Sequence, residues 1–148
     1  MAEQVLAVRG LDLVLDVRGA RRKRGAVAMT FPPHGEPNQL FTLNGRGRLS
    51  PMHAPQLCLD VKGGNLVEGA ELIFWTWKGG DSDNQAFAID GDGFLAATAS
   101  GGGGVVGATD AANESRLVAG TVPGADPLCG GPLRLCARSS ANALRWDW

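Results

Sequence analysis

Short runs of alternating apolar and polar residues dominate this chain, and one of them occurs three times. Asn-Gln-Leu-Phe at positions 38–41 returns as Asn-Gln-Ala-Phe at 84–87, and a weaker copy, Ala-Leu-Arg-Trp, occupies 143–146. In every copy another apolar residue follows the aromatic residue two positions later. Residues two apart in a strand lie on the same face. The pattern therefore predicts a fold built from copies of one small β unit.

The first two copies extend on both sides of this phrase. Residues 13–19 and 57–63 both form an apolar run that ends in Asp-Val, a cation and glycine. Further along, Asn-Gly at 44–45 and Asp-Gly at 90–91 are strong hairpin signals, because both central positions of such turns need positive φ. One loop of the second copy is longer than its counterpart in the first.

A third copy can be aligned with the second, although it stops early. Residues 117–136 match residues 57–76 without a gap, and Trp146 takes the place of Phe87. The chain ends before the last strand of this copy, and residues 3–8 can supply that strand. Leu6 would then have the role of Leu49 and Leu95 in the other copies. The two chain ends would meet in one copy, which closes the sheet and removes free edges.

We therefore expect a single all-β domain of three pseudo-symmetric, four-stranded units. Unit one covers about residues 11–51, unit two about 52–99, and unit three about 116–148 together with the N-terminal strand 3–8. A glycine-rich insertion, about residues 100–115, separates units two and three. It is expected to be a surface loop, because it lacks the Lys-Ser/Thr pair of the alternative, a phosphate-binding loop.

The composition excludes several classes of protein. The 148 residues carry a net charge of −1, which argues against nucleic acid as a partner. No apolar run reaches the ~18 residues of a transmembrane helix. Glu3, Arg9 and Asp12 interrupt any signal-peptide core. We expect a cytoplasmic protein, or one released without a signal peptide, with no cofactor.

The cysteines and histidines give no sign of catalysis. Three cysteines make an odd count; Cys129 and Cys136 either pair across a Gly-Gly-Pro turn or remain reduced thiols. His34 and His53 lie in proline-containing loops without metal-ligand spacing, and no nucleophile-elbow motif is present. We expect neither a metal site nor an enzyme.

Unit two holds the best set of ligand-binding groups. Asp60 follows an apolar strand, Trp75 and Trp77 are two apart on the next strand, and Asn84 and Gln85 follow a polar turn. A carboxylate accepts hydrogen bonds from neighbouring sugar hydroxyls, an amide both donates and accepts, and an indole stacks on the C–H face of a pyranose. The alternatives are structural: Gln85 tying turns together, Asp60 capping a turn, or either indole in the core.

Units one and three retain less of this set. Unit one keeps Asp16, Asn38 and Gln39, with Met29 expected at the position of Trp75 and Phe31 at that of Trp77, which predicts a weaker second site. Unit three lacks the acid, the aromatic and the amide. Gly120 is expected at the position of the acid, Leu135 at that of the aromatic and Ala143 at that of the amide.

These repeats resemble the ricin B-chain type of β-trefoil lectin, whose units carry a Gln-x-Trp motif. Residues 38–41 and 84–87 match it with Phe for Trp, and 143–146 keeps the Trp without the Gln. The resemblance covers nearly the whole chain apart from the insertion. It implies a β-trefoil that binds galactose or N-acetylgalactosamine through the acid, the second-strand aromatic and the Asn of units one and two.

The resemblance also bears on one cysteine. Members of the family often join the first two strands of a unit by a disulfide. Cys58 stands at the first of those places and Trp77 at the second, so we expect that bridge to be absent.

Arg21, Arg22, Lys23 and Arg24 form a basic loop between the first two strands of unit one. Four neighbouring cations favour either solvent or an anion, such as a sulfated glycan, an acidic sugar or an anionic membrane. The alternative function is that of a trefoil interaction protein, a protease inhibitor or a polyanion binder, acting through this loop and residues 32–37.

With two sites, or as a homodimer, a lectin of the ricin B-chain type would agglutinate cells through avidity.

Overall fold

The computed structural model describes residues 3–79, 83–99, 116–122, 124, 126 and 128–148. The expected insertion at residues 100–115 lies outside this part of the chain. The strands are β1 (Ala7–Val8), β2 (Val14–Val17), β3 (Ala26–Phe31), β4 (Phe41–Leu43), β5 (Leu49–Pro51), β6 (Leu57–Val61), β7 (Leu72–Thr76), β8 (Phe87–Ile89), β9 (Leu95–Ala97), β10 (Val118–Thr121), β11 (Gly131–Cys136) and β12 (Trp146–Asp147). Short 3-10 helices are η1 (Arg18–Ala20), η2 (Pro37–Gln39), η3 (Lys62–Gly64) and η4 (Asp83–Gln85).

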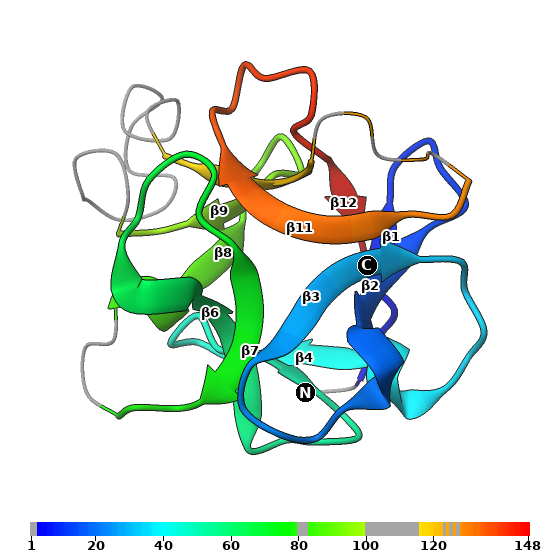
Figure 1. Ribbon diagram of the computed structural model, residues 1–148, viewed down its shortest axis with the longest axis vertical. Coiled ribbons are helices and arrows are strands. Elements are labelled where there is room, and N and C mark those ends of the chain that lie inside the picture. The colour runs from blue at the N-terminus through cyan, green and yellow to red at the C-terminus, as the bar shows by residue number, and fades with distance from the viewer. Residues whose placement is uncertain (1–2, 80–82, 100–115, 123, 125, 127) are drawn as a thin grey trace.

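The strands group into three units, each made of two antiparallel hairpins. Unit one contains β2 to β5 and unit two contains β6 to β9. Unit three consists of β10, β11 and β12, and β1 from the other end of the chain completes it by pairing Ala7 with Asp147 and Val8 with Trp146. The prediction that both chain ends would meet in one unit is therefore confirmed (Figure 1).

Pairing between units closes the structure. Strand β3 pairs with β7 through Ala26 and Phe74, and with β11 through Thr30 and Gly131. Figure 1 shows these three long strands arranged around a common centre, with one unit outside each. Strand β11 of unit three thus borders β3 of unit one, and β3 in turn borders β7 of unit two. Residues of a neighbouring unit therefore lie beside the second strand of units one and two.

The repeated aromatic residues form the centre of the core. Phe41, Phe87 and Trp146 are all fully buried, as the alternation predicted. Leu6, Leu49 and Leu95 are equally buried, which confirms that the N-terminal segment supplies the missing part of unit three. Burying side chains of this size stabilises a fold by about 1.5–3 kcal/mol each relative to exposure.

Strand register corrects one expectation in unit one. Phe31 pairs with Val14, and Trp75 pairs with Cys58; in both units this partner lies two residues before the aspartate. Phe31 therefore occupies the position of Trp75. The expectation that Met29 would correspond to Trp75, and Phe31 to Trp77, is wrong because the longer loop of unit two follows β7 rather than preceding it.

Unit three needs a similar correction of one residue. Gly120 pairs with Arg134, as Asp60 pairs with Ile73, so Cys136 stands at the position of Trp75. Leu135, expected at that position, is instead buried in the core. The turn before β11 is one residue longer than the turn before β7. An alignment of the two units without a gap cannot account for this extra residue.

Among the described residues, no helix combines the length and the apolar character needed to cross a bilayer.

Candidate functional site

A buried aspartate at the end of β2 organises the first candidate site. Only 3 % of Asp16 is exposed. Its Oδ1 accepts a hydrogen bond from Asn38 Nδ2 at 3.1 Å, and its Oδ2 accepts one from Gln39 Nε2 at 2.7 Å. The same two amides also donate to the backbone carbonyls of Val17 (3.3 Å) and Pro32 (3.1 Å). The acid is therefore held between η2 and the two strands of its hairpin.

Unit two repeats this arrangement. Asp60, equally buried, accepts from Asn84 Nδ2 at 3.1 Å and from Gln85 Nε2 at 2.9 Å. The amides donate to the carbonyls of Val61 (3.2 Å) and Thr76 (2.9 Å). Acid and amides, far apart in sequence, are brought together in both units as expected from the repeats.

The two glutamines hold the aspartates in place. Gln39 Oε1 accepts from the backbone N–H of His34 at 2.8 Å, and Gln85 Oε1 accepts from that of Lys78 at 3.0 Å. Both glutamines are fully buried, and each donates to a carboxylate and to a backbone carbonyl as well. Their geometry favours the structural alternative: each ties the end of the second strand to the 3-10 helix and orients the carboxylate.

His34 and Lys78 are not among the site residues predicted from the sequence, yet they occupy one position in the two units. The His34 Nε2 atom lies 3.4 Å from Asp16 Oδ2. Lys78 Nζ donates to Asn84 Oδ1 at 3.0 Å and lies 3.9 Å from Asp60 Oδ2. The signal was present in the sequence, because each residue follows its aspartate by the same number of positions.

The aromatic side chains differ in their surroundings. Phe31 is 42 % exposed, and its ring contacts that of His34 edge-on, with a centroid separation of 6.2 Å. Trp75 is half-buried, and the guanidinium of Arg24 lies over it at 5.1 Å. Trp77 is 47 % exposed and lies just beyond β7. The guanidiniums lying over its ring belong to Arg46 (5.7 Å) and Arg48 (4.3 Å).

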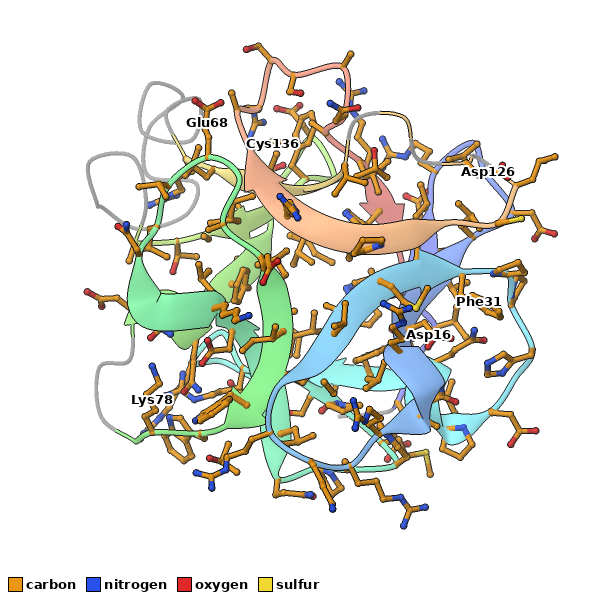
Figure 2. The ribbon with its side chains drawn as sticks, in the orientation of Figure 1. Asp16, Phe31, Glu68, Lys78, Asp126 and Cys136 are labelled. Carbon is orange, nitrogen blue, oxygen red and sulfur yellow. The ribbon has the colours of Figure 1, made fainter. Side chains whose placement is uncertain are left out.

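A cavity of about 640 Å³ lies beside Asp16. Phe31, His34 and Asn38 line it from unit one, and Gly131 and Pro132 line it from unit three. Figure 2 shows Asp16 and Phe31 on one side of the molecule and Lys78 on another, so the two sites are well separated. The hollow in unit one is large enough to receive a sugar ring.

Unit three has no equivalent site among its described residues. A side chain at Gly120, where the other units have aspartate, would begin 2.5 Å from the carbonyl oxygen of Asn142 and 2.6 Å from the sulfur of Cys136. Ala143 and Leu144 stand in place of the two amides. The space of the acid is therefore filled, and its hydrogen-bonding partners are gone.

Burial sets the protonation behaviour of both acids. It raises the pKa of Asp16 and of Asp60 above the usual range of an aspartate, because the charged form loses its hydration. Hydrogen bonds from Gln39 and Gln85 oppose part of this rise. Each carboxylate therefore takes up a proton at a higher pH than an exposed aspartate would.

This shift gives a pH prediction. Above its raised pKa each aspartate is ionised and can accept hydrogen bonds from sugar hydroxyls, and below that pKa it is protonated and loses acceptor capacity. We expect affinity for lactose, measured by calorimetry between about pH 7 and pH 4, to begin falling above the ordinary aspartate range. Amide NMR spectra at each pH would verify that the fold persists. Affinity that stayed constant until the pH reached that ordinary range would contradict the prediction.

All three cysteines are free thiols. Cys58 is buried, and that burial raises the pKa of its thiol to about 11, so the group stays protonated. The pairing of Cys129 with Cys136, left open by the sequence, is not formed, and neither is a bridge from Cys58.

The basic loop lies against unit two. The Gly25 N–H donates to the carbonyl of Phe74 at 2.8 Å, and Gln56 Nε2 donates to the carbonyl of Arg22 at 3.2 Å. Its four cationic residues are all exposed. The basic turn is exposed, as expected. Its hydrogen bonds to unit two hold it next to Trp75.

The fold and the two acid–amide sites define the class of this protein. Its three hairpin units are closed by the chain ends, and units one and two each carry a buried Asp–Asn–Gln cluster beside an accessible aromatic; together they form a β-trefoil of the lectin type. A family model described as "Ricin-type beta-trefoil lectin domain" matches residues 4–124. The chain belongs to that family.

Solved structures support the fold. A designed three-fold symmetric protein, ThreeFoil, has a TM-score of 0.70 and 24 % identity, covering 97 % of this chain and 96 % of its own. The trefoil lectin of the Vibrio vulnificus hemolysin/cytolysin has a TM-score of 0.68 and 23 % identity (99 % and 93 % covered). The earthworm R-type lectin C-half has a TM-score of 0.69 and 13 % identity (96 % and 93 % covered). No curated protein sequence matches the chain.

Proposed function

We propose that this protein binds glycans carrying galactose or N-acetylgalactosamine, through the sites of units one and two. The observation that supports this most directly is the arrangement in unit one. There a carboxylate, an amide and an exposed phenyl ring surround a cavity of about 640 Å³. Both units belong to a lectin family fold, and both keep the acid–amide cluster that unit three has lost.

The chemistry of the cluster suits two adjacent sugar hydroxyls. Asp16 accepts hydrogen bonds, and Asn38 Oδ1 accepts none from the described protein, so it remains available on the cavity side. The Phe31 ring offers an apolar surface for the C–H face of a pyranose. Sugar hydroxyls exchange water for protein partners, so each contact adds only about 0.5–1.5 kcal/mol and binding is expected to be weak per site.

The names of two structural neighbours are consistent with this class of ligand. The Vibrio vulnificus lectin was solved with N-acetyl-D-lactosamine, and the earthworm C-half with GalNAc. Identity to both is low, so these names support the class of sugar and not a particular glycan.

The ranking of the two sites changes with the register. The sequence favours unit two because its spacing predicts methionine at the aromatic position of unit one. Phe31 fills that position, and the cavity opens beside it, whereas Arg24 covers Trp75. We assign neutral galactosides principally to unit one. Two sites on one chain, or a homodimer, would crosslink glycans through avidity.

The test is calorimetric or NMR titration with lactose. Phe31→Ala is expected to weaken lactose binding at least about tenfold, because the stacking surface is lost, while the fold should persist since the ring lies outside the buried core. Met52→Ala, which also truncates an exposed apolar side chain, is the matched control and should bind as the parent does.

Two outcomes would contradict the proposal. One is the absence of binding to lactose, methyl galactoside and N-acetylgalactosamine. The other is equal affinity of Phe31→Ala and the parent protein.

The loop-based alternative, a protease inhibitor, has less support. The backbone of its first candidate loop, residues 32–37, is tied to Gln39 at two points, Pro32 and His34. This attachment supports a role for the loop in lining the proposed site of unit one and not as a separate surface.

A further inference from the structure

We propose that the unit-two site takes an acidic sugar, one bearing a carboxylate or a sulfate, whereas unit one takes the neutral galactoside. This inference rests on the proposed function and names the ligand class of its second site. It comes from a comparison of two sites with the same acid–amide cluster and different surroundings.

The first difference is the wall that each site receives from a neighbouring unit. In unit one this wall is β11, whose Gly131 pairs with Thr30 and whose Pro132 pairs with Met29. In unit two it is the start of β3, where Ala26 pairs with Phe74. The residue before each pairing strand is a glycine of positive φ, Gly130 or Gly25. The two walls are therefore equivalent, and one of them begins with the basic loop.

Arg24 is the residue that this wall brings to the aromatic. Its guanidinium lies 5.1 Å from the centre of the Trp75 ring. At the equivalent place in unit three's wall stands Cys129, which is uncharged and lies before Gly130. The same strand position thus carries a cation at site two and a neutral side chain at site one.

The second difference lies within the sites. His34 in unit one contacts Asp16 and leaves the Asn38 amide oxygen open. Lys78 in unit two instead donates to Asn84 Oδ1 and approaches Asp60. An ammonium group at this place adds a fixed positive charge beside the carboxylate and the amide, where a ligand would sit.

The surrounding charges reinforce the contrast. The unit-one cavity is lined by Arg18 and Glu36, which have opposite signs. Next to Lys78 in unit two, Trp77 lies under the guanidiniums of Arg46 and Arg48. The carboxylates of unit two there include the buried Asp60 and the exposed Asp83 at the start of η4; Lys62, which follows Asp60 as Arg18 follows Asp16, is paired with Glu71 at 3.1 Å.

An anionic substituent matches these cations. A guanidinium binds a carboxylate or a sulfate through two parallel N–H groups, and an ammonium pairs with either as a point charge. An acidic sugar stacked on Trp75 would place its charge between Arg24 and Lys78. Any sugar ring that stacks on Trp75 must move the Arg24 side chain off the indole. An acidic sugar regains a charge interaction with Arg24 after that movement, whereas a neutral sugar does not.

The test compares three probes on the intact protein: lactose, 3′-sialyllactose and galactose 6-sulfate. Calorimetry at low salt gives the affinities, and NMR shifts of the indole N–H of Trp75 locate the site. Arg24→Gln is expected to weaken binding of the acidic probe at least about tenfold and to leave lactose binding at Phe31 of unit one unchanged. Arg22→Gln, which removes the same charge from the same loop, is the matched control and should have little effect.

A second variant tests the other cation. Lys78→His gives unit two the residue of unit one and is expected to shift its preference toward lactose. Binding of acidic probes should also fall as salt rises, since the charges are exposed, whereas lactose binding should not. Whichever acidic probe binds more tightly identifies carboxylate or sulfate as the group recognised.

The outcomes separate this inference from the proposed function. Lactose bound at Phe31 together with no preference of unit two for acidic probes would overturn the inference alone. An equal loss in Arg22→Gln and Arg24→Gln would also overturn it, because diffuse charge rather than the site would then be responsible. Failure of all sugars to bind would overturn the proposed function.

Discussion

Replacing Gly130 by alanine is expected to lower the free energy of unfolding by about 3–5 kcal/mol. Gly130 has φ +77°, and a Cβ built there would lie 2.1 Å from the carbonyl oxygen of Thr30. The left-handed backbone costs a side chain about 1–2 kcal/mol, and the clash with a paired strand adds to it. The contact lies where β11 meets β3, so relieving it would separate two units. Thermal unfolding should drop by roughly 10 °C.

Gly25→Ala provides the matched control. Gly25 occupies the equivalent place before β3 with φ +91°, but nothing lies within 4 Å of the point that an added methyl group would occupy. Only the backbone cost of about 1–2 kcal/mol should apply. Similar losses in the two variants, measured by urea unfolding, would show that close packing between the units is not what requires glycine at position 130.

Removing the Gln85 side chain is expected to be nearly as damaging. In Gln85→Ala, a carboxylate oxygen of Asp60, the Thr76 carbonyl and the Lys78 N–H all lose their partner. Each buried polar group left unpaired costs about 1–3 kcal/mol, so the total loss should be about 3–5 kcal/mol. Because Asp60 is no longer oriented, sugar binding at unit two should disappear as well.

Two further variants make this measurement decisive. Gln56→Ala removes an exposed glutamine with one hydrogen bond to the Arg22 carbonyl and should change stability by less than about 1 kcal/mol. Gln39→Ala should behave as Gln85→Ala does, because Gln39 bonds to Asp16, Pro32 and His34 in the same way. Chemical denaturation that ranked Gln56→Ala with the other two would contradict the role assigned to the buried glutamines.

The repeated pattern was sufficient to predict the architecture. Alternation around Phe41, Phe87 and Trp146 identified core strands, because burial at period two is a local property of each segment. The return of the N-terminus to unit three followed from the missing strand and the apolar Leu6. The alignment of strands across loops was less predictable, because loop lengths vary independently of the strands. The positions expected for Phe31 and Leu135 in the repeat were therefore wrong.

The acid–amide clusters of units one and two were predictable from the sequence for a related reason. Asp16 and Asn38, or Asp60 and Asn84, belong to one unit, so the repeat itself indicated that they meet. The walls of the sites belong to neighbouring units. The sequence of unit one does not indicate that Gly131 of unit three will lie beside its site. The contact of Arg24 with Trp75 likewise depends on strand pairing between units. The meeting of the acids and amides is therefore predictable from the sequence, whereas the difference between the two sites is not.

The wall that β11 lends to unit one also sets an order of events during translation. Everything that unit two's site uses, from Arg24 to Gln85, has been synthesised once the middle of the chain is made. The pocket around Asp16 must wait for Gly131 and Pro132, long after its own unit has emerged from the ribosome. Occupancy of that pocket by lactose would consequently report that the chain has been made as far as β11 and that β11 has paired with β3, which makes it an assay for the joining of units one and three.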